Sequence, residues 1–377
     1  MRFAEQIDPG LFAGRTEAEI RGTVDNMVEA MRGGKDRAER DRVLFSFRGM
    51  HDALVAAMRM DPELTEAISS NVFNTLSRSI VVDGVMEGYT GVPRIAAELF
   101  RLIPTPGKPT GRIARATTDA TMEEVQQLEQ YKAAGMSDKY VTFENKKFGR
   151  HIPLSREAVM EDQTGTVLDT ARGVGEVMAN YEEKSALNTI QDVAGFVGYN
   201  PAGTQTALYS ATATESKTQT PAANLVATNA LAAWTNVDAA WKKLGSKIGE
   251  NGDPIGAATR VSILAPWALR GVGGYVLKNS KSTVATINAD APRMLQESLP
   301  DGARYSPWLD LQSPTTWYMG DFQRQFVKTS YWDMETTFIN GKNEASFQLR
   351  DIYGTFLVSS YFDYIATDFR FVIKNTA

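Results

Sequence analysis

Histidine and cysteine are the residues to test first for chemistry, because imidazole and thiolate serve as metal ligands, bases and nucleophiles. The chain has two histidines, His51 and His151, and no cysteine. Neither histidine lies at a spacing typical of a metal motif, so we assign both a structural role. The lack of cysteine excludes disulfides, thiolate metal sites and a cysteine nucleophile.

Other catalytic patterns are absent from the sequence as well. It contains no G-x-x-x-x-G-K-[ST] phosphate loop and no G-x-S-x-G nucleophile motif. The glycines of Gly271-Val-Gly-Gly274 fall inside an expected helix, where we interpret them as packing positions. Glu182 and Glu183 lie on another expected helix and are interpreted as part of a solvated face. We therefore predict no catalytic residue, no bound metal and no cofactor.

The composition is that of an ordinary soluble globular protein. Of 377 residues, 43% are hydrophobic and 23% charged, enough for two ordinary domains or one large one. The net charge of −5 shows that the surface as a whole is not basic, which argues against general binding of nucleic acid over the whole surface. No apolar run is long enough to cross a bilayer, and the first ten residues lack the apolar segment of a signal peptide.

A long helix within His151–Ala194 is the element around which the rest is organised. After a break at Glu161–Gly165, apolar residues recur at helical spacing on one face, namely Val167, Ala171, Val174, Met178 and Tyr181. Further along, Leu187 and Ile190 fall on the side that was polar, so we expect the helix to pass between different neighbours. Gly173 and Gly175 weaken a helix and predict close approach of another backbone.

The segments before this helix are predicted to be a helical region, a connector and a hairpin. Residues 15–80 show helical periodicity, and residues 80–109 are rich in glycine and proline, which favours an extended connector. Tyr140–Phe148 alternates like a strand, with Ala133–Asp138 as the turn and Glu129–Lys132 as the opposing strand. Such a hairpin has too few apolar residues to bury itself, so it is either floppy or covered by a partner.

The C-terminal half predicts an α+β fold. Residues 195–228 are interpreted as a loop, and Trp234 and Trp241 as core residues of the helix that follows it. The expected elements are a helix at Leu231–Ile248, a strand at Arg260–Ala265, a helix at Trp267–Lys278, paired strands within Trp317–Lys328, a hairpin at Thr336–Leu349 and a last strand at Phe369–Lys374.

This order of elements resembles that of the major capsid proteins of tailed bacteriophages, which have the Hong Kong 97-type fold. The local match lies within Val125–Asp162, which contains VQQLEQY and TFENKKFGRHIPLSREAVMED and is similar to Mu-like prophage head subunits. Further matches are ILAPW at Ile263–Trp267 and WYMGDF at Trp317–Phe322. The resemblance covers roughly residues 85–377.

The resemblance implies a domain plan and a function. Copies of the chain would form the hexamers and pentamers of an icosahedral shell that encloses double-stranded DNA without reading its sequence. Separate scaffold, portal and decoration proteins would be partners, with assembly in the host cytoplasm and no membrane or cofactor. The plan comprises an N-terminal arm (1–110), an extended hairpin loop (111–155), a peripheral domain with the spine helix and a loop (156–228), an axial domain (229–325) and returning C-terminal strands (326–377).

Charged residues of the hairpin are the expected assembly contacts. They are Glu129, Lys132, Asp138, Lys139, Glu144, Lys146 and Lys147. An exposed lysine is protonated at neutral pH and is a poor nucleophile. We therefore interpret the lysines as ion-pair partners for an acidic surface on the adjacent subunit.

Three alternatives stay open at this point. The chain could form an encapsulin-like protein compartment, or it could be an α/β enzyme whose motifs are unrecognised. The helical N-terminal segment is either part of the arm or a retained scaffold.

Overall fold

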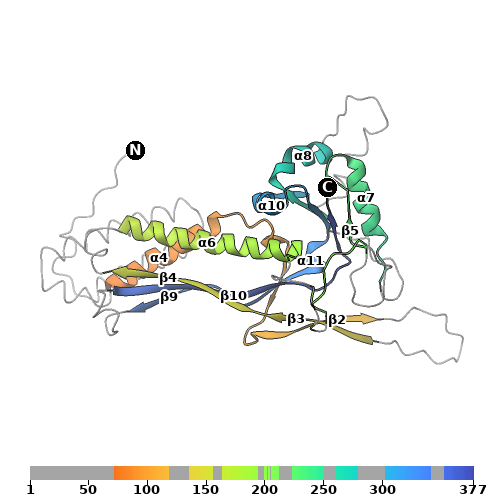
Figure 1. Ribbon diagram of the computed structural model, residues 1–377. Helices are drawn as coiled ribbons and strands as arrows, with labels where there is room; N and C mark the ends of the chain where they lie inside the picture. Colours follow the sequence, from red (N-terminus) through yellow and green to blue (C-terminus); the bar gives the residue numbers. More distant parts are fainter. Residues whose placement is uncertain are drawn as a thin grey trace, which may run out of the picture. The chain divides into compact units, whose positions relative to one another are not determined.

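The description rests on a computed structural model (Figure 1), which describes residues 72–118, 136–155, 164–193, 199–201, 203, 205–211, 223–249, 260–278, 302–340 and 352–377. They divide into two compact units. The first unit draws on residues 1–93, 148–179 and 334–360, and the second on residues 94–147, 180–333 and 361–377. His51 and most of the predicted N-terminal helices lie outside the described residues.

The first unit packs helices against strands. It contains α4 (Val72–Gly91), the N-terminal part of α6 (Thr164–Gln191), most of β4 (Lys146–Ser155) and parts of β9 (Phe326–Asn340) and β10 (Ile352–Ala366). The two helices lie along the strands in Figure 1. The core between them consists of Val81, Val85, Ile152, Ala171, Phe356 and Val358, with Val174 and Met334 packed against it.

The second unit is built on a five-stranded sheet in the order β5-β11-β8-β6-β7. These strands are β5 (Leu225–Val226), β6 (Ser262–Pro266), β7 (Ala303–Ser306), β8 (Trp317–Gly320) and β11 (Val372–Asn375). Strand β8 runs antiparallel to both of its neighbours, and the two outer pairs are parallel. All five residues of β6 are buried, as expected of a central strand.

Helices complete the second unit. They are α7 (Trp234–Gly245), the short η3 (Trp267–Leu269), α8 (Arg270–Lys278), α10 (Pro307–Gln312) and α11 (Phe322–Gln325). Val237, Ala240 and Leu244 of α7 are buried against the sheet, and Trp234 and Trp241 pack on the same core. The predicted core role of the two tryptophans is therefore confirmed.

A four-stranded sheet has the order β1-β9-β10-β4, with β1 at Arg101–Pro104 parallel to β9. The first arm of the hairpin predicted at Thr336–Leu349 lies in β9, and its second arm lies outside the described residues. Strand β9 pairs with the later strand β10, and each has 15 residues. The last strand begins at Val372, three residues later than predicted. The paired strands predicted within Trp317–Lys328 are wrong, because β8 pairs with β6 and β11, and α11 follows β8.

The connector predicted for residues 80–109 is also wrong in its first part. Helix α4 continues to Gly91, and only then do the short η2 (Ala97–Leu99) and β1 follow. Gly88 lies so close to the backbone of Arg172 that a β-carbon would collide with it. Glycine in this stretch therefore serves close helix packing, whereas the sequence pattern was interpreted as chain breaks.

Helix α6 has the predicted position, and its environment changes along its length. Ala171 and Met178 are buried, Val174 and Tyr181 are half-buried, and the side chain of Val167 is outside the described part. From Ser185 to Gln191 every residue is buried, including Leu187 and Ile190 on the formerly polar side. The prediction that neighbours change along the helix is confirmed.

The solvated face predicted for Glu182 and Glu183 is wrong, since each is only 1% exposed. Glu183 accepts hydrogen bonds from the backbone N–H groups of Ala96 and Ala97, at 2.8 and 3.2 Å, and from the hydroxyl of Ser306 at 3.3 Å. Burial raises the pKa of Glu183, and these hydrogen bonds oppose the rise. Glu182 forms ion pairs with Arg94 and Lys328. Buried carboxylates with such partners fix the helix in one orientation.

The described helices include none that is long and apolar enough for a membrane span.

Glycines 173 and 175 have different surroundings. A β-carbon at Gly175 would collide with the backbone of Val85 and Tyr89, whereas at Gly173 no described residue lies within 4 Å of that position. Close approach of another backbone is confirmed at Gly175, and among the described residues none makes such an approach at Gly173.

This contrast predicts opposite effects for one substitution at two neighbouring positions. Gly175→Ala should destabilise the subunit by about 1–3 kcal/mol, because the added methyl group overpacks the contact with α4. Gly173→Ala should stabilise it by up to about 1 kcal/mol, because alanine favours the helix and meets no neighbour. Thermal unfolding of the unassembled subunit by circular dichroism measures both. Equal melting temperatures would contradict the packing of α4 on α6.

Candidate assembly site at the hairpin root

A two-stranded sheet forms the hairpin. Strand β2 (Thr110–Thr118) pairs antiparallel with β3 (Met136–Glu144), from Thr110 opposite Glu144 to Thr118 opposite Met136. The predicted turn at residues 133–138 is wrong, because Met136–Asp138 already belongs to β3. The alternating pattern of Tyr140–Phe148 gave no sign of the partner of β3. This partner is β2, which precedes the opposing strand predicted at Glu129–Lys132. Residues 119–135, including Glu129 and Lys132, lie outside the described part.

The root of the hairpin is anchored by Asn145, which separates β3 from β4 and is 3% exposed. Its side-chain amide donates to the hydroxyl of Thr105 at 3.0 Å and to the carbonyl of Lys108 at 3.3 Å. Its side-chain oxygen accepts a hydrogen bond of 2.6 Å from the hydroxyl of Thr329. The backbone N–H donates to the carbonyl of Pro109 at 2.8 Å. Asn145 thus ties both ends of the hairpin to β9.

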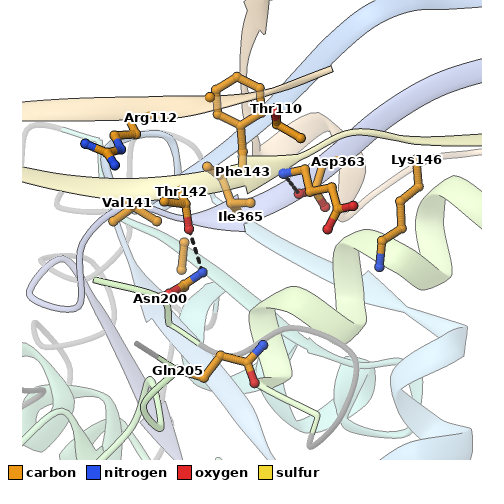
Figure 2. A pocket seen from close by; sticks show the side chains of 13 residues that line it. Thr110, Arg112, Val141, Thr142, Phe143, Lys146, Asn200, Gln205, Asp363 and Ile365 are labelled. Atoms are coloured by element: carbon orange, nitrogen blue, oxygen red, sulfur yellow. Dashed lines mark hydrogen bonds between the residues drawn. The ribbon is translucent and has the colours of Figure 1, made fainter. Parts of the chain in front are cut away.

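Beside Asn145, the root of the hairpin borders a cavity of about 480 Å³ (Figure 2). Val141 and Phe143 from β3 and Ile365 from β10 contribute apolar surface, and Asn200 donates from its amide to the hydroxyl of Thr142 at 2.7 Å. Phe143 is buried and covers Gly111 across the strand pair, where a larger residue would collide with its ring. The cavity therefore lies where the hairpin meets its own unit.

Asp363 introduces a carboxylate into this cavity. It accepts a hydrogen bond of 3.2 Å from the backbone N–H of Glu144, the last residue of β3. Burial raises the pKa of Asp363 to about 6. Backbone hydrogen bonds from Glu144 and Tyr364 and the charge of Lys146 lower the pKa, and the charge of Glu144 adds to the rise.

The predicted assembly residues have different positions in the structure. Glu144 and Lys146 are exposed and border the cavity together. Lys147 is also exposed, and its ammonium lies 5.5 Å from the ring centre of Trp332 in the same chain. Asp138 and Lys139 lie in β3, and the structure describes only their backbone.

Sequence reasoning missed Asn145 and Asp363, the two residues that fasten the hairpin root. Asn145 interrupts the alternating pattern, and an asparagine within a predicted strand signals a break. Asp363 lies in an aromatic strand, where a lone carboxylate signals either an edge or a specific partner. His151 is exposed on β4. Among the residues that the structure describes, no three His, Asp or Glu side chains gather as a metal site would require.

Removal of the Asn145 amide should loosen the root. Asn145→Ala removes the acceptor at 2.6 Å from the buried Thr329 hydroxyl, which keeps only the carbonyl of Asp363 at 3.4 Å, and it removes the amide donor to Thr105 and Lys108. The loss costs about 1–3 kcal/mol. We expect a lower melting temperature and faster tryptic cleavage at Lys146 and Lys147. Asn200→Ala is the matched control, since it removes a single hydrogen bond to Thr142. An equal or smaller effect of Asn145→Ala would contradict the anchoring role.

Asp363 should make the stability of the subunit depend on pH. Because its pKa is raised from 3.8 to about 6, the folded protein holds a proton between these values that the unfolded chain releases. The free energy of unfolding therefore falls as pH rises through this window. Asp363→Asn should remove that part of the slope in unfolding experiments from about pH 3 to about pH 7, a range that flanks the window. An unchanged slope in Asp363→Asn would refute the assignment.

Comparison with known proteins agrees with this architecture. A family model described as phage capsid protein matches residues 138–375, which is more than half of the chain. No curated protein sequence matches.

Several solved capsid structures are similar at low identity. The capsid of a native GTA particle is 11% identical, with 76% of this chain and 91% of that chain covered and a TM-score of 0.46. A virus-like particle from Pyrococcus furiosus is 10% identical, with 79% and 97% covered and a TM-score of 0.47. A structure from Mycobacterium phage Bobi is 12% identical, with 75% and 89% covered and a TM-score of 0.43.

The matched stretch begins in β3 and ends in β11, so it includes α6, both large strands and the five-stranded sheet. The predicted mixture of helices and strands is present, and the family match confirms the predicted role as a phage capsid protein. The Hong Kong 97 type stays a prediction. The match favours this role over the encapsulin-like compartment and over an α/β enzyme. The chain belongs to the phage capsid protein family.

Proposed function

We propose that copies of this chain form the hexamers and pentamers of an icosahedral shell around double-stranded DNA, and that the hairpin of each copy lies on its neighbour. One observation carries the proposal. Strands β2 and β3 pair with each other through nine residue pairs, and within the described part of the chain they belong to no larger sheet. Near its root the pair is covered by its own unit, where Val141 and Phe143 are buried. Further out, a pair of strands alone is marginal in water, so we infer that a surface from another copy covers it.

The proposal uses the domain plan suggested by the resemblance. Residues 111–155 serve as the extended loop, α6 as the spine of the peripheral domain, and residues 229–325 as the axial domain at the capsomer centre. Residues 1–110 form the arm, and residues 326–377 return as C-terminal strands. Many repeated contacts of modest area then hold the shell, because linked contacts act together.

The DNA is enclosed without sequence-specific binding. The chain carries a net charge of −5. A mildly acidic shell does not bind the DNA phosphates strongly, so the packed DNA is not trapped on the protein. Scaffold, portal and decoration proteins complete the particle, which assembles in the host cytoplasm. The role is structural, and we assign the chain no reaction.

Shortening the hairpin tests the proposal. Replacing Arg115–Lys139 by two glycines keeps the root pairs Gly111–Phe143 and Ile113–Val141. We expect a folded subunit with an unchanged melting temperature, because the buried Val141 and Phe143 remain. Closed shells should be absent from negative-stain micrographs.

The full-length chain, purified in parallel, provides the reference for shell formation. Normal shells from the shortened chain would show that the hairpin is dispensable and would refute its proposed contact. A shortened chain that fails to fold would be followed by deletion of residues 119–135 alone, with the same two readouts.

A further inference from the structure

The cavity at the hairpin root has the size of a ligand site. Its volume of about 480 Å³ lies within the range of pockets that hold small molecules. The residues around it come from β2, β3, β4 and β10 and from the loop that contains Asn200 and Gln205 (Figure 2). All of these residues belong to the second unit. Segments that are distant in sequence thus enclose one space, which a small molecule would contact on several sides.

One side of the cavity is apolar. It consists of Val141 and Phe143 of β3 and Ile365 of β10, which we call the apolar wall. The three side chains are buried and stand on strands, so the wall exists before any ligand binds. Such a surface suits a short aliphatic stem better than a hydrated metal ion. Among the described residues no three His, Asp or Glu side chains gather as a metal site would require.

The carboxylate of Asp363 lies beside the apolar wall. It accepts a hydrogen bond of 3.2 Å from the backbone N–H of Glu144. Within the described part of the chain, the structure records no ion pair with Asp363. A largely buried carboxylate is costly without a counter-charge, and a cation that carries N–H donors offsets this cost. The cavity therefore combines an apolar surface with a site for a positive charge.

The other charged residues that line the cavity are Arg112, Glu144 and Lys146, and all three are exposed. The guanidinium carbon of Arg112 lies 4.4 Å from the ring centre of Tyr140. Figure 2 draws Arg112 and Lys146 at opposite sides of the view, with Asp363 between them. Water screens exposed charges much more than buried ones, so the carboxylate of Asp363 dominates the electrostatics inside the cavity.

We propose that this cavity binds a small organic cation, with its ammonium or guanidinium group at Asp363 and its short aliphatic stem on the apolar wall. A guanidinium can donate two parallel hydrogen bonds to a carboxylate. The bound molecule joins β10 to the end of β3, because Asp363 also accepts from the backbone N–H of Glu144. Occupation therefore tightens the hairpin root. The site lies within one subunit and does not depend on the proposed shell.

Titration with n-butylguanidinium tests the site, and n-butylurea, which has nearly the same shape without the charge, is the matched control compound. Calorimetry of the unassembled full-length chain at about pH 7.5 should show saturable binding of the cation and none of the urea. The melting temperature should rise with the cation concentration, because the ligand binds the folded chain alone. Tryptic cleavage after Lys146 should become slower. Equal binding of the two compounds, or binding of neither, would overturn the inference.

Two substitutions locate the binding in the cavity. Asp363→Asn keeps an oxygen for the N–H of Glu144 but loses the charge, so the affinity should fall at least about tenfold. Gln205→Trp narrows the cavity at an exposed position and should also weaken binding, without a change of charge. If Asp363→Asn fails to fold, Gln205→Trp decides the question. Unchanged affinity in a folded variant of either kind would contradict the site.

Asp333→Asn is the matched control variant, because it makes the same change at an exposed carboxylate of the same unit that does not line the cavity. Its affinity for n-butylguanidinium should equal that of the wild type. An equal loss in Asp333→Asn would show general attraction of the cation to the protein and would overturn the inference.

The affinity should also depend on pH in a defined direction. Burial raises the pKa of Asp363 to about 6, so most of the carboxyl groups are protonated at about pH 5 and cannot pair with a cation. Binding should therefore weaken about tenfold from about pH 7.5 to about pH 5 in the wild type. Asp363→Asn should lack this change. Wild-type affinity that is the same at both pH values would refute the role of Asp363.

A lysine or arginine side chain of another copy would bring the same chemistry to the cavity. Titration of assembled shells separates this source from a free molecule. Shells should bind n-butylguanidinium with the affinity of the single subunit, and shells that exclude it would overturn a site for a free ligand. A chain that never forms shells contradicts only the proposed function, because titration of the subunit still decides this inference.

Discussion

The hydrogen bonds of Asn145 decide where the hairpin leaves the protein. Residues 136–155 are continuous in sequence, yet β3 pairs with β2 and β4 pairs with β10. A chain passes from one sheet to another where its hydrogen-bonding groups are satisfied outside both ladders. At Asn145 these hydrogen bonds are made with Thr105, Lys108, Pro109 and Thr329. Without this junction the alternating sequence would continue as one strand. The existence of a separate two-stranded hairpin, and so the proposed contact with a neighbour, depends on it.

Helix α6 meets two kinds of environment. Its N-terminal part has one buried face, packed on α4 and the strands, and an opposite side on which Asp169 and Val177 are exposed. Its C-terminal part is buried at every residue from Ser185 to Gln191, and the buried Glu183 just before it accepts hydrogen bonds from backbone N–H groups. Most of the exposed residues of α6 therefore lie in its N-terminal part, in the first unit.

Helical periodicity allowed much of this fold to be predicted from the sequence. The apolar spacing within α6 and α7 predicted a buried face on each helix. Pro266 and Asn340 were predicted to end strands, and β6 and β9 end at these residues. Glycine misled the interpretation of α4, because Gly88 looks the same in sequence whether it ends a helix or lets one pack closely. Pairing of β3 with β2 was also hidden, since register depends on a partner strand that carries no local signal. Likewise Glu182 and Glu183 look solvated until their partners, Arg94 and Ala96, are brought near by the fold.

The core of the first unit also bears on the order of events during synthesis. Val81 and Val85 come early in the chain, and Phe356 and Val358 of the same core come near its end. A ribosome releases the N-terminal residues first, so α4 waits for β10 before its apolar face is covered. A truncated chain lacking β10 leaves that face exposed and is a substrate for chaperones and proteases. The first unit is therefore complete only when the chain has been made as far as β10.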